Sequence, residues 1–369
     1  MKSTRGRLVH ISSLAAFDRR TAAGARSLSG WRVRGLDLRD RAEVLARCRL
    51  AGATFLGCTF AEGGAARAET AGALVLPAIP DVPVDPYRAD LYAPRELYDA
   101  PAYPDSLDAR AYAWAQESDD DAALLAQALH DHAVDGALER ALGGWRRTRS
   151  VVGVMGGHAQ QRGDAAYAEA ARLGRGLGAS HLVATGGGPG AMEAANLGAW
   201  LSGRGSDELD AALVDLARVP AYRPSIGAWA DAAFAVRERF PDGGASLGIP
   251  TWHYGHEPPN VFATAIAKYF RNATREAILL EVCDGGIVFL PGAAGTVQEV
   301  FQDACENYYA DESALAPMVL VGRTYWTETL PAWPLLHALA RERTMEEHVH
   351  LVDTAEEAAE LLGAVPAAR

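Results

Sequence analysis

Residues 291–299, PGAAGTVQE, combine the residue types that phosphate binding and sugar chemistry need. They join an apolar run to a stretch with helical periodicity, which predicts a turn between a strand and a helix. Gly292 and Gly295 let backbone N–H groups approach a ligand, and the start of a helix favours an anion. Thr296 adds a hydroxyl donor. Glu299 lies one helical turn further on, where a carboxylate can reach a group attached to the bound phosphate.

Two more glycine-rich turns follow apolar runs earlier in the chain. They are MGGHAQ at residues 155–160 and TGGGPGAME at residues 185–193. Three such turns indicate phosphate binding more strongly than one, because a single turn can use glycine for tight turning alone. The first turn lacks the GxGxxG spacing, so the sequence does not support NAD binding. The residues of these turns expected to bind phosphate or substrate are Gly156, Gly157, Gly187, Gly188, Gly190, Met192 and Glu193.

The elements that position these turns alternate regularly from residue 150 onward. Near-continuous apolar strands between helical stretches predict an α/β fold with a Rossmann-like, doubly wound parallel sheet. In such sheets, ligands bind beyond the carboxyl ends of the strands, where the three turns lie. The expected strands are 151–155, 181–184, 246–249, 286–290, 317–321 and 349–352, and the expected helices are 164–177, 191–201, 206–217, 228–239, 261–282, 296–309 and 354–362.

The N-terminal part of the chain is less regular. Residues 1–100 mix short apolar runs with helical stretches and predict a smaller α/β region, in which no internal repeat is evident. Residues 101–149 are expected to form a linker and a helix, and residues 150–369 a nucleotide-binding domain. No motif before residue 146 indicates a role for the N-terminal region.

Composition excludes several classes of partner. The 369 residues carry a net charge of −12, whereas a nucleic-acid-binding domain would show a basic face. No apolar run approaches the roughly 18–20 residues of a membrane span. The basic N-terminus is not followed by a signal-like apolar segment, and the four cysteines show no CxxC spacing. We therefore expect a cytoplasmic protein with reduced thiols and no bound metal.

The lysine count excludes two kinds of cofactor chemistry. The chain has only two lysines, Lys2 and Lys268. A pyridoxal phosphate enzyme needs a lysine for its Schiff base, but Lys2 lies near the terminus and Lys268 falls in an expected helix without a phosphate loop beside it. The Walker-type loop, GxxxxGK[ST], also needs a lysine and is absent. We expect no organic cofactor.

Two stretches resemble the paired motifs of the Lonely Guy family, which is also labelled lysine decarboxylase-like. They are GGGPGAMEAANLGA at residues 186–199 and PGAAGTVQE at residues 291–299, within a resemblance that spans residues 150–362. The family has a glycine-rich turn after its second strand and PGGxGTxxE after its fourth. EPPN at residues 257–260 is similar to the larger bacterial purine/pyrimidine nucleotide nucleosidases. The resemblance implies a Rossmann-like enzyme that hydrolyses nucleoside 5′-monophosphates to free base and ribose 5-phosphate.

The resemblance also implies roles for single residues. The catalytic glutamate of the family falls on Glu299 and its catalytic arginine on Arg275, with Arg271 one turn earlier as the competitor. Asn260, from EPPN, joins the expected substrate-binding residues. Glu193 fits either a contact to base or ribose or a cap of its own helix. Because the family forms dimers, the resemblance further implies a homodimer or a larger homo-oligomer with a partner helix near the site.

One departure from the family pattern leaves an alternative function open. Ala293 stands where the family has glycine, which weakens the site if that position needs positive φ or close contact with phosphate. The alternative is a non-catalytic, nucleotide- or molybdenum-cofactor-binding Rossmann protein. Ala293 favours this alternative, whereas Glu299 and Arg275 favour the enzyme.

Overall fold

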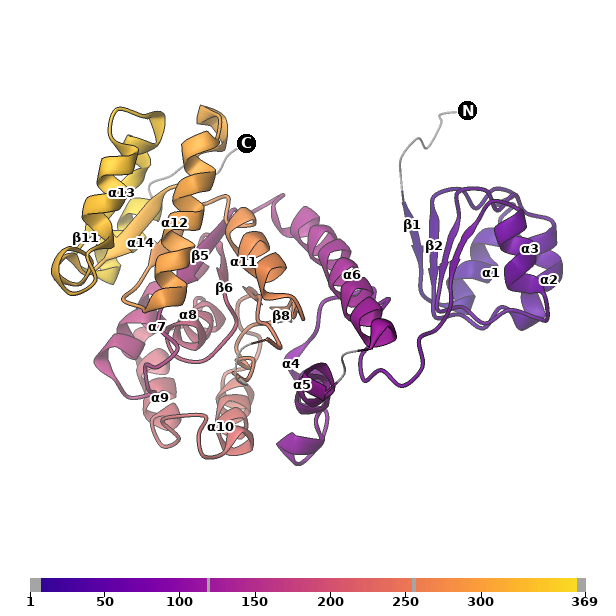
Figure 1. Cartoon of the computed structure of the whole chain (residues 1–369). Helices are drawn as coiled ribbons and strands as arrows, with labels where there is room; N and C mark the ends of the chain where they lie inside the picture. The colour runs from indigo at the N-terminus through magenta and orange to yellow at the C-terminus, as the bar shows by residue number, and fades with distance from the viewer. Residues whose placement is uncertain (1–7, 118–119, 254–256, 364–369) are drawn as a thin grey trace. The chain divides into compact units, whose positions relative to one another are not determined.

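The computed structural model describes residues 8–117, 120–253 and 257–363 (Figure 1). The chain divides into two compact units, each described by itself. The first unit comprises Met1–Asp90 and Glu117–Ala137, and the second comprises Leu91–Gln116 and Leu138–Arg369. The long helix α6 (Asp121–Trp145) contributes its first part to one unit and its last turns to the other.

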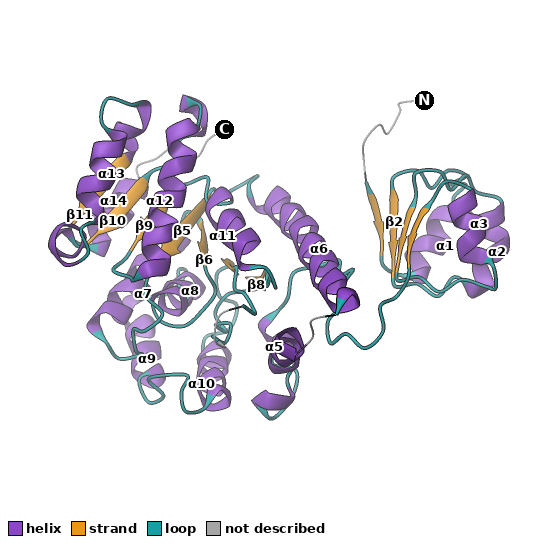
Figure 2. Ribbon diagram, in the orientation of Figure 1, coloured by secondary structure: helices purple, strands orange, loops and turns teal. Residues whose placement is uncertain are grey.

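The first unit contains a repeat that the sequence analysis missed. Its four strands form a parallel sheet in chain order, and its helices lie in the connections between them (Figure 2). Paired residues of successive strands are 22, 22 and 20 positions apart, so each coil of chain stacks on the one before it. The elements are β1 (Val9–Ile11), α1 (Leu14–Ala22), β2 (Trp31–Arg34), α2 (Ala42–Ala46), β3 (Thr54–Leu56), α3 (Gly64–Thr70) and β4 (Leu74–Leu76).

A column of glycines makes successive coils turn at the same place. Gly30, Gly52 and Gly72 have φ of 78°, 79° and 85°, in the left-handed region where a Cβ is unfavourable. The Gly30 N–H donates to the Gly52 carbonyl at 2.9 Å, and the Gly52 N–H donates to the Gly72 carbonyl at 3.0 Å. The residues after these glycines differ (WRV, ATF and ALV), which is why the repeat is not evident in the sequence.

The second unit is built on a seven-stranded sheet in the order β11-β10-β9-β5-β6-β7-β8, in which all neighbours pair in parallel. This arrangement confirms the predicted α/β, Rossmann-like fold. The strands are almost entirely buried, as expected for a sheet covered on both faces. Their bounds are β5 (Val151–Met155), β6 (Leu182–Thr185), β7 (Ser246–Gly248), β8 (Ala265–Ile266), β9 (Ile287–Phe289), β10 (Met318–Val321) and β11 (Val349–Val352).

Helices cover both faces of this sheet. The chain moves in opposite directions along the sheet from β5 to β6 and from β9 to β10, so right-handed crossovers place α7 and α12 on opposite faces. Helices α8 and α14 pack with α7, whereas α11 and α13 pack with α12. The helices are α4 (Pro94–Leu97), α5 (Leu107–Glu117), α7 (Ala165–Gly178), α8 (Ala191–Trp200), α9 (Ser206–Leu216), α10 (Ile226–Arg239), α11 (Asn272–Glu281), α12 (Ala294–Tyr309), α13 (Ala332–Ala340) and α14 (Ala355–Gly363). None of the helices that the structure describes is long and apolar enough to cross a membrane.

The predicted helix over residues 261–282 is wrong in its first half, because α11 begins only at Asn272. Before it, β8 pairs with β7 on one side, and Ile266 bridges Tyr92 on the other. The side chain of Asn260 accepts hydrogen bonds from the N–H groups of Phe262 and Ala263, which closes a turn before the strand. When a run is buried on all sides, it is apolar along its whole length whether it forms a strand or a helix. The apolar pattern of residues 261–271 therefore could not distinguish the two.

Candidate active site

A cavity of about 720 Å³ lies at the carboxyl end of the sheet in the second unit. The turns after β5, β6 and β9 line it, because these three strands are neighbours in the sheet. Residues of α11 and the stretch after β10 complete its wall. The predicted site residues that line this cavity are Gly156, Gly157, Gly188, Met192, Arg275, Gly292, Gly295, Thr296 and Glu299.

Four predicted site residues do not line the cavity, and two of them are glycines that shape the second turn. Gly187 and Gly190 have φ of 72° and 70°. A Cβ on Gly187 would lie 2.7 Å from Pro250 Cδ, and a Cβ on Gly190 would lie 2.8 Å from the carbonyl carbon of His158. The close packing of this turn against its neighbours therefore accounts for both glycines without a ligand.

Glu193 also lies away from the cavity, in a buried ion pair. Its two carboxylate oxygens accept from Nε of Arg162, at 3.0 Å, and from the Nη2 group of the same side chain. Arg162 also donates to the Trp229 carbonyl at 3.0 Å and lies over the Trp229 ring. Both charged side chains are only 1% exposed, so Glu193 connects the first two glycine turns instead of contacting a ligand.

Asn260, the fourth of these residues, holds the second glycine turn from behind. Its backbone N–H donates to the Gly187 carbonyl at 2.8 Å, and its side-chain amide donates to the Gly188 carbonyl at 3.2 Å. The same amide donates to Asn196 at 2.9 Å. These bonds occupy the carbonyl groups of the turn, and carbonyl oxygens would repel a bound phosphate.

The charged centre of the cavity is formed by α11 and α12. Nη1 of Arg275 lies 3.8 Å from Oε1 of Glu299, and Nη2 lies 2.8 Å from Oε1 of Glu276. Nη2 also donates to Asn272 at 3.2 Å. Among the described residues, no partner binds Nε of Arg275 or Oε2 of Glu276, although both atoms are buried. Buried polar atoms without partners are rare in folded proteins, so this group has spare hydrogen-bonding capacity.

The electrostatics of this centre hold a proton on Glu299 near neutral pH. Burial raises the pKa of Glu299 to about 8, and the negative charge of Glu276 adds to that rise, while Arg275 lowers it. One helical turn further along α12, burial and Glu306 raise the pKa of Asp303 to about 8 as well. Of the two, only Glu299 lines the cavity, and a strongly shifted carboxyl group in a cavity is typical of functional sites.

The start of α12 presents donors to the cavity. The first intrahelical bond runs from the Val297 N–H to the Ala293 carbonyl, so the N–H groups of Ala294, Gly295 and Thr296 precede the helical ladder. Within the described chain, none of these three N–H groups has a backbone acceptor outside α12. Ala293 has a φ of −96°, so an alanine adopts this backbone without the strain of a positive φ.

The structure separates the two arginines that compete for the catalytic role. Arg275 lines the cavity and lies beside Glu299. Arg271 is exposed at the N-terminus of α11 and does not line the cavity. The position one turn further into α11 is therefore the one that can reach a ligand.

Three residues that contribute to the site were not among those predicted from the sequence. Tyr325, after β10, donates its hydroxyl to the Gly292 carbonyl at 2.6 Å. Glu276 lines the cavity beside Arg275, and Arg162 neutralises Glu193. Glu276 is the immediate neighbour of Arg275 in the sequence, and this adjacency was the only sequence signal that could have found it. Tyr325 and Arg162 belong to no motif.

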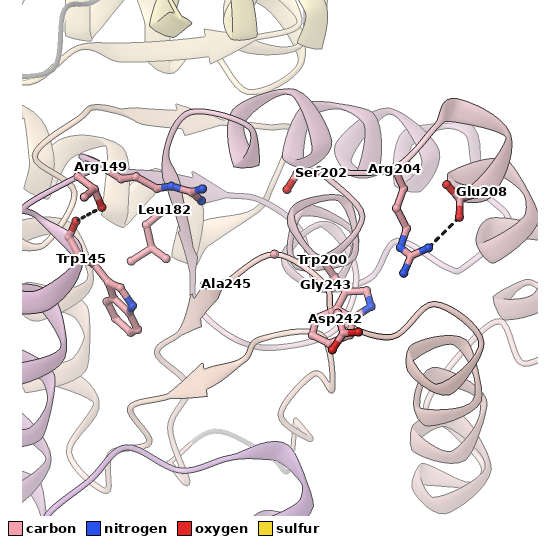
Figure 3. Close-up of a pocket in the computed structure, with 13 residues that line it drawn as sticks. Trp145, Arg149, Leu182, Trp200, Ser202, Arg204, Glu208, Asp242, Gly243 and Ala245 are labelled. Carbon is pink, nitrogen blue, oxygen red and sulfur yellow. Dashed lines mark hydrogen bonds and ion pairs between the residues drawn. The ribbon is translucent and has the colours of Figure 1, made fainter.

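A second cavity, of about 700 Å³, lies at the opposite, amino end of the sheet (Figure 3). Arg149, Leu182 and Ala245, at or just before the starts of β5, β6 and β7, line it. Its other arginine, Arg204, donates to Glu208 at 2.9 Å, so that charge is already compensated. Helices α6 and α8 end at this cavity, and helix C-termini carry partial negative charge. The cavity at the carboxyl end is therefore the better phosphate site.

Residues 226–365 match the family model described as "Possible lysine decarboxylase". This part of the chain belongs to the lysine decarboxylase-like, or Lonely Guy, family. The matched segment contains α10 to α14, and with them Arg275, Glu299 and the turn at residues 291–296. Membership of this family supports a nucleotide-related function. No curated protein matches the chain.

Solved structures of a molybdenum cofactor binding protein and of a molybdenum cofactor carrier protein are similar to part of the chain. One is the molybdenum cofactor binding protein of the phototrophic bacterium Rippkaea orientalis, with 16% identity, 58% of this chain and 96% of that chain covered, and a TM-score of 0.38. The other is the molybdenum cofactor carrier protein of Chlamydomonas reinhardtii, with 16% identity, 58% and 96% coverage, and a TM-score of 0.36. Likenesses this distant carry no functional inference.

Proposed function

We propose that the second unit hydrolyses the N-glycosidic bond of a nucleoside 5′-monophosphate and releases free base and ribose 5-phosphate. The observation that carries the proposal is the placement of Glu299 and Arg275, 3.8 Å apart, in the same cavity as the start of α12. Phosphate bound at the start of the helix would place the attached ribose about one turn along α12, near Glu299.

Phosphate recognition would come from the backbone. The N–H groups of Ala294, Gly295 and Thr296 stand at the positive end of the α12 dipole, a position that favours an anion. Gly156, Gly157 and Gly188 line the facing side of the cavity without side chains that would fill it. Ala293 is compatible with this role because its φ is negative.

The chemistry would rest on Glu299 and Arg275. As the bond from C1′ to the base breaks, the ribose becomes cationic, and the Glu299 carboxylate would stabilise that charge and orient the attacking water. Water adds its oxygen to C1′, and the base leaves with a proton. Arg275 presents a guanidinium whose Nε has no partner among the described residues, so it can bind a ribose or phosphate oxygen without losing its contact to Glu276.

The position of Lys268 supports hydrolysis over the decarboxylation that the family description suggests. Its Nζ lies 2.5 Å from Oδ1 of Asp108, fully buried and outside the cavity. The Trp252 indole N–H donates to the same Asp108 oxygen at 2.8 Å. A lysine fixed in this way is not available to form a Schiff base. Lys2 lies outside the described residues.

The test is incubation of the full chain with a panel of purine and pyrimidine 5′-monophosphates, followed by chromatography for free base and ribose 5-phosphate. We expect both products in equal amounts from at least one nucleotide. The matching nucleosides are the control and should remain intact. Tight binding of nucleotides without release of base would instead support the non-catalytic binding protein.

A further inference from the structure

Two carbonyl groups of the turn at residues 291–296 accept hydrogen bonds from other segments of the second unit. The Pro291 carbonyl accepts from the Gly157 N–H at 3.2 Å, and the Gly292 carbonyl accepts from the Tyr325 hydroxyl at 2.6 Å. With both carbonyls occupied, the groups of this turn that remain without a described partner are donors at the start of α12.

The second glycine turn is arranged in the same way. Asn260 occupies the carbonyls of Gly187 and Gly188 from outside that turn. Two turns that face one cavity therefore each have a residue, distant in sequence, that binds their carbonyls. A peptide next to glycine rotates easily, and rotation would turn an oxygen toward the bound anion in place of an N–H.

Tyr325 is well placed to prevent this rotation at Gly292. It begins a π-helical turn, Tyr325–Thr329, after β10, and such turns occur frequently at functional sites. Its ring packs edge-on against the ring of Trp326, with the two ring centroids 5.1 Å apart. Because Trp326 is fully buried, this contact limits the movement of the tyrosine. Tyr325 also lines the cavity itself. β9 and β10 are parallel neighbours, so the segments that follow them lie side by side.

We propose that Tyr325 is a positioning residue for phosphate recognition: its hydroxyl fixes the Gly292 carbonyl so that this oxygen cannot turn toward an anion bound at the start of α12. The inference rests on the proposed function only in that the cavity binds a 5′-phosphate; it does not require hydrolysis. The hydroxyl acts through the backbone and need not touch the substrate.

The test is the variant Tyr325→Phe, which removes the hydroxyl and keeps the ring. Calorimetry with AMP and with adenosine measures phosphate recognition directly. We expect AMP binding to weaken about tenfold, the effect of losing one hydrogen bond, and adenosine binding to stay within about twofold. Tyr309→Phe is the matched control, since Tyr309 is on α12 but 80% exposed, and it should change neither affinity.

Three outcomes would overturn the inference. Unchanged AMP binding in Tyr325→Phe would show that the turn keeps its geometry without the hydroxyl. Equal weakening for AMP and adenosine would show a general loss of structure instead of a loss of phosphate recognition. Failure of the unaltered chain to bind AMP at all would overturn this inference and the proposed function together. Binding without hydrolysis, with the tenfold effect of Tyr325→Phe retained, would overturn the proposed function alone.

Discussion

Two arginine–carboxylate groups lie near the glycine-rich turns of the second unit, and they differ in how completely their polar atoms are paired. Arg162 and Glu193 are 1% exposed, and the arginine binds both carboxylate oxygens and a backbone carbonyl. Arg275 and Glu299 are 12% exposed and 3.8 Å apart, beyond the distance of a good hydrogen bond. Arg275 also leaves its Nε without a partner in the described chain.

The difference separates a structural pair from a group that can bind a ligand. Every bond that Arg162 makes is internal, so a ligand could contact it only by breaking an interaction already present. Nε of Arg275 and Oε2 of Glu276 have no partner within the described part of the chain, and both side chains line a cavity. Burial and the charge of Glu276 outweigh Arg275 and raise the pKa of Glu299. Incomplete pairing of this kind lowers stability, and in a cavity with a strongly shifted carboxyl group it is typical of functional sites.

The largest difference is expected in stability. Arg162→Ala should lower the free energy of unfolding by about 3–5 kcal/mol, because it leaves Glu193 charged, buried and unpaired. Arg275→Ala should lower it by no more than about 1 kcal/mol, since its carboxylate neighbours border a cavity and can take up protons. Urea denaturation of both variants measures the two values. Similar losses in the two variants would remove the distinction between the groups.

The next-largest effect is expected in the binding of phosphate by the N–H groups at the start of α12, in the cavity that Arg275 and Glu299 also line. If the N–H groups at the start of α12 bind phosphate, AMP should bind at least about a hundredfold more tightly than adenosine, because two or three charge-assisted hydrogen bonds are at stake. Titration calorimetry of the unaltered chain gives both affinities. Equal affinity for AMP and adenosine would contradict the phosphate assignment.

A smaller effect should appear in the pH dependence. The proposed reaction needs ionised Glu299, whose pKa is raised to about 8, so kcat/KM should rise about tenfold per pH unit between pH 6.5 and 7.5 and level off above pH 8. For folding, the same shift from 4.5 works in the opposite direction: the contribution of Glu299 to the free energy of unfolding is fully present below pH 4.5 and is lost as pH rises through 8. Activity that falls through pH 8 would make Glu299 a proton donor instead.

The strands of the second unit and the turn at residues 291–296 could be predicted because their signals are local in the sequence. The strands of the second unit are short apolar runs bounded by glycine, and the turn at residues 291–296 stands in a recognisable strand–turn–helix pattern. The raised pKa of Glu299 could not be predicted, because it depends on burial and on Glu276 from another helix. Arg162 lies 31 residues from Glu193 in the sequence, and Tyr325 lies 33 residues from Gly292. Each residue meets its partner only in the folded sheet.

Two errors have the same physical origin. The helix predicted over residues 261–282 gave way to β8, because pairing with β7 and burial on all sides override the local pattern. The coils of the first unit were not recognised as a repeat, because little beyond their glycine spacing is common to them. In both regions, contacts between distant segments determine the structure.

The most direct test of the account is the rate at which Glu299→Gln releases free base from a nucleoside 5′-monophosphate. Glutamine keeps the size and most of the hydrogen bonding of Glu299 but cannot carry its negative charge. We predict at least about a hundredfold lower turnover, with nucleotide binding within a few-fold of the unaltered chain and little change in stability. Turnover by Glu299→Gln at the unaltered rate would contradict the central claim and leave Glu299 as a buried carboxyl group without a catalytic role.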